Sequence, residues 1–175
     1  FSLGARPETS LTGQKLVSTG IFSAESGDLI NAECAMVSGP LSLQGEYFRG
    51  YSQGSENHKF WGFYLYGSWF LTGEARKYER SKAVFAGVDV NHGFHPLEGG
   101  WGVLELGLRY SYLDLNDREI RGGREKNLTL GLNWYLYPEV RLMANYIRAR
   151  VEDRASPPVD GGSANIWMIR FQLAF

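Results

Sequence analysis

Three arginines stand where their side chains could bind an oxyanion: Arg109, Arg141 and Arg170. A guanidinium group is a planar, permanently charged fork whose N–H groups match the oxygens of phosphate and carboxylate. Each arginine lies in a segment that alternates apolar and polar residues, and each falls on the polar side of its segment. This placement predicts that the arginines contact a solute, or else that they form ion pairs that brace a wall.

Three acidic residues also lie on the polar sides of alternating segments, in some cases in the same segment as an arginine. They are Glu33, Glu46 and Glu105. Because both signs of charge are present, the local balance does not by itself favour anions over cations.

The sequence holds no motif that is specific for catalysis or metal binding. His92 and His95 form an H-x-x-H pair in a Gly-rich stretch that offers no obvious third ligand. Asp114, Asn116 and Asp117 lack the spacing of a calcium-binding loop. A nucleophile elbow, a P-loop and a dinucleotide-binding fingerprint are also missing. We therefore predict no catalytic residue, no metal site and no cofactor.

Segment 127–136 indicates which kind of element carries the polar residues. Its apolar residues recur at every second position: Leu128, Leu130, Leu132, Trp134 and Leu136. A helix would spread these side chains around its circumference, whereas a strand places them all on one face. The segment is therefore predicted to be a strand.

Similar segments occur along the whole chain. We predict about nine strands, near residues 1–6, 14–22, 27–37, 41–51, 58–71, 101–114, 124–136, 140–151 and 164–175. Tight turns are predicted at 38–40 and 137–139, and longer polar loops at 52–57, 115–123 and 153–163. Alternation of the two kinds is typical of an up-and-down meander in an outer-membrane barrel. The stretch 72–100 is the exception, because it is a long connection at the end of the barrel where short turns are expected.

Charges on the polar faces argue against a dry interior. Burial of an unpaired charge costs several kcal/mol per ion, so a water-filled interior explains these residues better than the packed core of a soluble barrel or sandwich. The expected fold is all-β, an antiparallel transmembrane β-barrel whose apolar faces meet lipid. A soluble ligand-binding barrel is the alternative, and a requirement for detergent would distinguish the two.

Aromatic residues gather near the ends of the predicted strands, as they do in the interfacial girdles of membrane barrels. The expected girdle residues are Trp61, Trp69, Trp101, Trp134, Tyr137, Phe171 and Phe175.

Length and composition indicate one domain, residues 1–175. The 18 Lys and Arg residues nearly balance 19 Asp and Glu residues, so no basic field would attract nucleic acid. The single cysteine, Cys34, excludes an intrachain disulfide. No apolar run approaches the roughly 18 residues of a spanning helix.

The predicted number of strands is odd, which suggests an incomplete barrel. If the chain ends in the periplasm, the first strand runs inward from the outside, unlike the first strand of a complete bacterial barrel. We therefore expect this chain to be the C-terminal part of a larger barrel.

Several segments resemble the phosphate-selective porin O and P family. The longest are GGWGVLELGLRYSYLDLND at 99–117 and GGREKNLTLGLNWYL at 122–136. Others are PEVRLMANYIRA at 138–149, SWFLTGE at 68–74, GPLSLQGEY at 39–47 and RPETSLT at 6–12. The resemblance covers most of the chain.

The resemblance implies a sixteen-stranded, typically trimeric barrel among the lipid and lipopolysaccharide of the bacterial outer membrane. Such a porin passes small anions, phosphate or polyphosphate, through a lumen lined by Arg and Lys. The end of the chain at Phe175 resembles the signal that the outer-membrane assembly machinery reads. A general or non-conducting barrel with a structural or interaction role is the alternative function.

Overall fold

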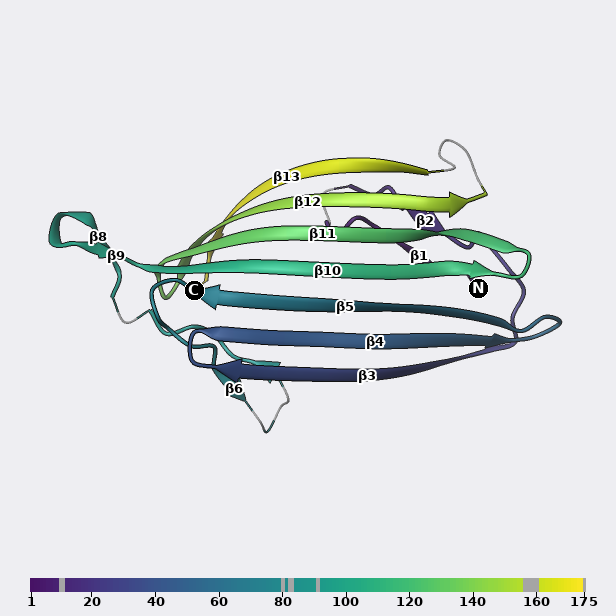
Figure 1. Cartoon of the computed structure of the whole chain (residues 1–175), viewed down its shortest axis with the longest axis horizontal. Coiled ribbons are helices and arrows are strands. Elements are labelled where there is room, and N and C mark those ends of the chain that lie inside the picture. The colour runs from purple at the N-terminus through teal and green to yellow at the C-terminus, as the bar shows by residue number, and fades with distance from the viewer. Residues whose placement is uncertain (10–11, 80, 82–83, 91, 156–160, 175) are drawn as a thin grey trace.

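The computed structural model describes the chain except for residues 10–11, 80, 82–83, 91, 156–160 and 175. Seven long strands form one antiparallel sheet. They are β3 (Ser26–Ser38), β4 (Leu41–Gln53), β5 (His58–Phe70), β10 (Val103–Asp117), β11 (Ile120–Tyr137), β12 (Val140–Arg154) and β13 (Gly161–Leu173). The order in the sheet is β13-β12-β11-β10-β5-β4-β3, so each long strand pairs with the long strand next to it in the chain. This up-and-down order confirms the predicted meander (Figure 1).

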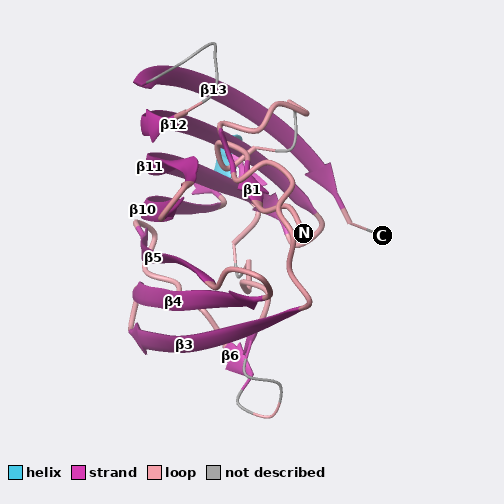
Figure 2. Ribbon diagram, turned by 90° about the vertical axis from the view of Figure 1, so that its right-hand side faces the viewer, coloured by secondary structure: helices cyan, strands magenta, loops and turns pink. Residues whose placement is uncertain are grey.

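The sheet curves into an arc, with the N-terminal segment on its concave side (Figure 2). Apolar side chains cover the other, convex face. Leu108 and Leu130 lie opposite each other on neighbouring strands there, and each is 50% exposed. Exposed leucines in register are expected where a wall meets lipid rather than water. This open, curved wall agrees with the predicted fold, an all-β antiparallel membrane barrel.

The connection between β10 and β11 is shorter than expected. Residues 115–123 were predicted to form a long polar loop, but both strands continue through this range and only Arg118 and Glu119 form the turn. The polar residues remain in the strands because they pair across the hairpin: Asp114 lies opposite Arg124, and the two side chains form an ion pair of 3.6 Å. The prediction of a loop here was wrong.

The N-terminal 25 residues do not add long strands to the wall. The wall strands predicted at 1–6 and 14–22 were wrong, because the described part of this region holds only two short paired strands of two residues each, β1 (Gly4–Ala5) and β2 (Val17–Ser18). Within the described residues the segment instead crosses the concave face, where β2 contacts β11. The part of the chain that the structure describes therefore contributes seven long strands to the wall rather than the predicted nine.

Apolar packing holds the N-terminal segment against the wall. Val17 is fully buried in a cluster with Phe60, Leu115 and Val151, which come from three different wall strands. Gly123 permits this close approach. Its φ of +97° suits glycine, and a Cβ built on it would lie 3.0 Å from Val17 Cγ1.

A second segment, residues 71–102, links β5 to β10. It contains the pair β6 (Tyr78–Glu79) and β7 (Val84–Phe85), then β8 (Phe94–His95), the 3-10 helix η1 (Pro96–Glu98) and β9 (Gly100–Trp101). The β8–β9 hairpin projects beyond the strand ends (Figure 1). Trp101, predicted to open a wall strand, belongs to this hairpin, since Gly102 at φ +70° separates it from β10. Among the described residues, no helix has the length and apolar character needed to cross a membrane.

Candidate functional site: the polar concave face

The concave face carries polar side chains from every wall strand. Glu105 and Arg109 alternate along β10 with outward leucines, and both contact segments that lie on the concave side. Strand register places the other polar candidates of the sequence on the same face: Glu33, Glu46, Arg141 and Arg170. The structure divides these six residues among four separate groups rather than bringing them into one site.

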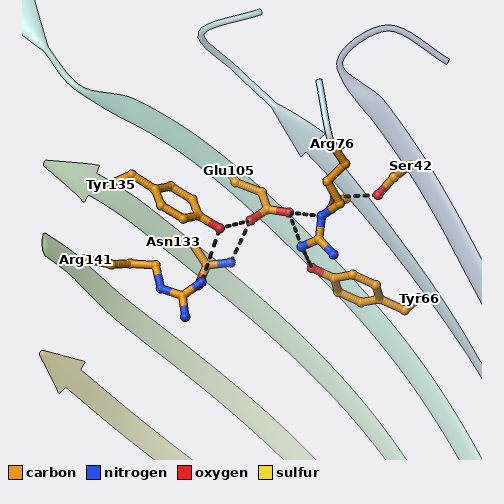
Figure 3. Close-up of polar contacts among 8 residues, drawn as sticks. Ser42, Tyr66, Arg76, Glu105, Asn133, Tyr135 and Arg141 are labelled. Atoms are coloured by element: carbon orange, nitrogen blue, oxygen red, sulfur yellow. Dashed lines mark hydrogen bonds and ion pairs between the residues drawn. The ribbon is translucent and has the colours of Figure 1, made fainter. Parts of the chain in front are cut away.

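The first group surrounds Glu105, whose side chain is fully buried. Four hydrogen bonds satisfy its carboxylate (Figure 3). Arg76 donates two of them to Oε1, from Nε at 3.2 Å and Nη2 at 2.7 Å. Asn133 Nδ2 and Tyr135 Oη each donate to Oε2 at 2.9 Å. The negative charge of Glu105 is therefore compensated within the wall.

Arg76 comes from the connecting segment 71–102, not from a wall strand. Its guanidinium also lies over the rings of Tyr66 and Phe85 and donates to the Tyr66 hydroxyl at 3.5 Å. Burial opposes the charge of this group, the neighbouring Glu105 favours it, and the net effect raises the pKa of Arg76 above its usual range. Sequence reasoning missed Arg76, because no local pattern indicates that this segment folds back onto the concave face.

Arg141 and Arg170 form the second group, at the end of the wall that carries the short turns. Arg141 donates to the Tyr135 hydroxyl at 3.3 Å and to Gln172 Oε1 at 2.8 Å, and both acceptors are neutral. Arg170 lies opposite Met143, at the next inward position along β12 and β13. It is exposed and has no ion pair among the described residues. Two positive charges on β12 and β13 are therefore not neutralised by a neighbouring carboxylate in the described part of the chain.

Arg109 belongs to the third group, which fastens the N-terminal segment. Its Nε lies 2.9 Å from Glu8 Oε1, and the guanidinium stacks on the ring of Tyr64 at 4.1 Å from the ring centre. Thr129 donates its hydroxyl to the other oxygen of Glu8 at 2.5 Å. Glu8, which the sequence did not single out, thus gives Arg109 the bracing contact that was one of its two predicted roles.

Glu33 and Glu46 lie opposite each other on β3 and β4. Asn31 donates to Glu46 at 3.3 Å, and no cation pairs with either carboxylate in the described residues. Like charges directly opposite are unfavourable in a sheet unless water or a counterion separates them. The acidic pair and the basic pair occupy opposite ends of the arc.

The outward face carries the aromatic residues predicted to form girdles. Trp69, Trp134 and Phe171 lie near the short-turn end, and Trp61 lies near the other end, among Tyr47, Phe63, Tyr110 and Tyr112. Trp134 donates its indole N–H to the carbonyl of Trp101 at 2.7 Å, and Tyr137 donates to the carbonyl of Phe94 at 2.8 Å. Phe175 lies outside the described residues.

The two groups of outward aromatics are separated by a band of leucines. From Leu104, which pairs with Trp134, to Tyr112, β10 advances eight residues, which at about 3.3 Å each is about 26 Å along the strand. The apolar band of outer-membrane barrels is about 25 Å tall. Because the strands of such barrels tilt by about 35–45°, this length along the strand corresponds to a height of about 20 Å, somewhat less than that band.

Comparisons with known proteins agree with this architecture. The family model described as phosphate-selective porin O and P matches residues 1–175. An uncharacterized protein of Caulobacter vibrioides is 30% identical over 97% of this chain and 34% of its own length. Porin O of Pseudomonas aeruginosa is 29% identical over 69% of this chain and 29% of its own length.

The chain spans about a third of the length of the curated relatives it matches. The family match nevertheless extends over the whole chain, and its residues include both the wall strands and the two segments on the concave face. The chain therefore belongs to the phosphate-selective porin O and P family of the bacterial outer membrane.

Proposed function

We propose that the protein forms part of a water-filled outer-membrane channel for passive diffusion of small anions, phosphate or polyphosphate among them. The observation that carries the proposal is the pair Arg141 and Arg170, whose charges are not cancelled by carboxylates in the described residues. A channel wall attracts ions whose charge is opposite in sign to the unneutralised charges of the wall. Family membership supports a channel rather than an enzyme.

The remaining charges of the concave face contribute less to selectivity. Glu105 is compensated by Arg76, and Arg109 is paired with Glu8. Since a compensated pair has only a weak field at a distance, the pore field depends on the residues that remain free. We therefore assign solute contact to Arg141 and Arg170, and a bracing role to Arg109.

The acidic pair Glu33 and Glu46 favours a second candidate, a general diffusion channel with little preference between ions. Both carboxylates face the concave side without a cation partner in the described residues. If they lie as close to the solute path as the arginines do, they would offset the attraction of anions.

The remaining partners belong to the same proposal. The whole protein would assemble as a homotrimer among outer-membrane lipid and lipopolysaccharide, and the C-terminal Phe175 would be read by the assembly machinery. The residues predicted to form girdles, Trp61, Trp69, Trp101, Trp134, Tyr137, Phe171 and Phe175, would stand at the membrane interfaces.

Reversal potentials in planar bilayers test the proposal on the full natural protein. Replacing Arg141 and Arg170 by Gln is expected to shift selectivity toward cations, while Arg118→Gln, which removes one positive charge at an exposed turn, leaves it unchanged. Anion-selective steps that phosphate saturates would support the proposal. An unchanged reversal potential in the double variant, or a folded protein that does not conduct, would refute it.

A further inference from the structure

The outward face of β11 and β12 changes from apolar to basic toward the loop end. Successive outward pairs across the two strands are Leu130 with Tyr146, Leu128 with Arg148, and Lys126 with Arg150. Each step along the strands is about 6.6 Å. The first basic side chains therefore follow directly after the leucine band, where the headgroups of a membrane would lie.

Two of these three cations, Lys126 and Arg150, share a single carboxylate. Lys126 Nζ lies 2.8 Å from Glu152 Oε2, and Arg150 Nε lies 3.1 Å from Glu152 Oε1. Arg148 is exposed and has no hydrogen bond or ion pair in the described part of the chain. Arg150 is 68% exposed in spite of its ion pair. The patch thus keeps an excess of positive charge that faces outward.

Strand β13 completes a hollow beside the arginines. Asn165 lies opposite Arg148 and Ser163 lies opposite Arg150, so that hydrogen-bonding side chains flank both guanidinium groups. The hollow has a volume of about 460 Å³ and is lined by Arg148, Arg150, Glu152, Gly161 and Ser163. The glycine has no side chain to fill it.

An aromatic pair lies on the membrane side of this hollow. The rings of Tyr146 and Trp167 are 4.5 Å apart, and the Tyr146 hydroxyl donates to Asn165 at 2.9 Å. Aromatic residues with a polar tip prefer the level where acyl chains meet headgroups. The order along the wall is therefore apolar, aromatic and then cationic, which suits in turn the acyl chains, the interfacial region and the phosphate group of an anionic lipid.

We propose that Arg148, Arg150 and Lys126 bind the phosphate group of an anionic lipid on the outside of the wall. Guanidinium forks match phosphate oxygens, and Ser163 and Asn165 can donate further hydrogen bonds. The lipid's acyl chains lie over the leucine band below. A dissolved solute in the channel does not reach this site, because the sheet separates it from the concave face.

Native mass spectrometry of the full natural protein in a neutral detergent tests the proposal. The probes are diphosphorylated lipid A and the same lipid with its phosphates removed. The double variant R148Q/R150Q is expected to bind the phosphorylated lipid about 30-fold more weakly, at about 1 kcal/mol for each cation. Arg118→Gln removes one positive charge from the turn at the same end and is expected to bind normally.

Correct folding of each variant is checked by its heat-modifiable migration in gels. The charge-conserving variant R148K/R150K is expected to retain most of the binding, so a loss in R148Q/R150Q reports charge rather than misfolding. Equal binding of the two lipids, or normal binding by R148Q/R150Q, overturns the proposal. A fall in oligomer mass without a change in lipid binding also overturns it, since the patch would then be an interface between copies of the chain.

Discussion

Arg76 Nη2 lies 2.7 Å from Glu105 Oε1, although 29 residues separate the two in the chain. The pair joins the connecting segment 71–102 to the concave face. Arg76 remains 18% exposed, whereas Glu105 is fully buried. The contact therefore both compensates a buried charge and fixes the position of the segment.

Arg76→Gln is expected to destabilise the protein by about 3 kcal/mol, because it leaves the buried carboxylate of Glu105 without its counter-charge. Urea unfolding in detergent, followed by tryptophan fluorescence, measures the change. The double variant R76Q/E105Q should recover most of the loss. Lys77→Gln is the control, since its ion pair with Asp89 is exposed on both sides and contributes little. Equal stability of R76Q and K77Q would contradict the assignment.

Glu8→Gln is expected to loosen the N-terminal segment, because the ion pair with Arg109 is lost. The segment should then be cut faster by trypsin at Lys15, and single-channel conductance should rise if the segment leaves the concave face. Glu25→Gln changes an exposed residue next to the same segment and should leave both measurements unchanged. An unaltered rate of cleavage in Glu8→Gln would show that apolar packing around Val17 suffices to hold the segment.

Gly123→Ala is expected to lower the free energy of unfolding by more than about 1 kcal/mol. The φ of +97° disfavours a side chain, and the new methyl group would meet Val17. Gly50→Ala is the matched control, because Gly50 has no positive φ and no atom within 4 Å of its added Cβ. Chemical denaturation of the two variants side by side gives the difference, and comparable stabilities would argue against close packing at Gly123.

Trp134→Phe is expected to release the β8–β9 hairpin, because the indole N–H no longer donates to the carbonyl of Trp101. The hydrogen bond is worth about 1 kcal/mol. Amide hydrogen exchange across residues 94–101 should become faster, whereas Trp69→Phe should leave it unchanged. If exchange is equally slow in both variants, the aromatic contact of Phe94 with residue 134 holds the hairpin by itself.

The wall was predictable because side chains in a strand alternate with a period of two. In β10 and β11 this alternation fixed which residues share a face, and the structure places Leu108 and Leu130 on one side and Glu105 and Arg109 on the other. The hairpin at 118–119 was missed for a related reason. A polar stretch indicates a loop only when its charges have no partner, and here Asp114 and Arg124 face each other across the strands.

The features that the sequence did not predict depend on contacts between distant parts of the chain. A wall strand was expected at 14–22, but the burial of Val17 comes from packing against Phe60, Leu115 and Val151. Glu8 and Arg76 acquire their roles from residues far along the chain, and a local pattern carries no information about such partners. The polar face could therefore be predicted, whereas which of its charges are neutralised could not.

The position of the N-terminal segment has a consequence for the order of folding. Thr129 binds Glu8 across 121 residues, and Arg154 donates to the carbonyl of Leu16 across 138. Closing such long loops costs entropy that hairpins of neighbouring strands do not incur. Residues 1–25 are therefore expected to dock on the concave face only after the hairpins of these strands have assembled and the sheet has acquired its curvature.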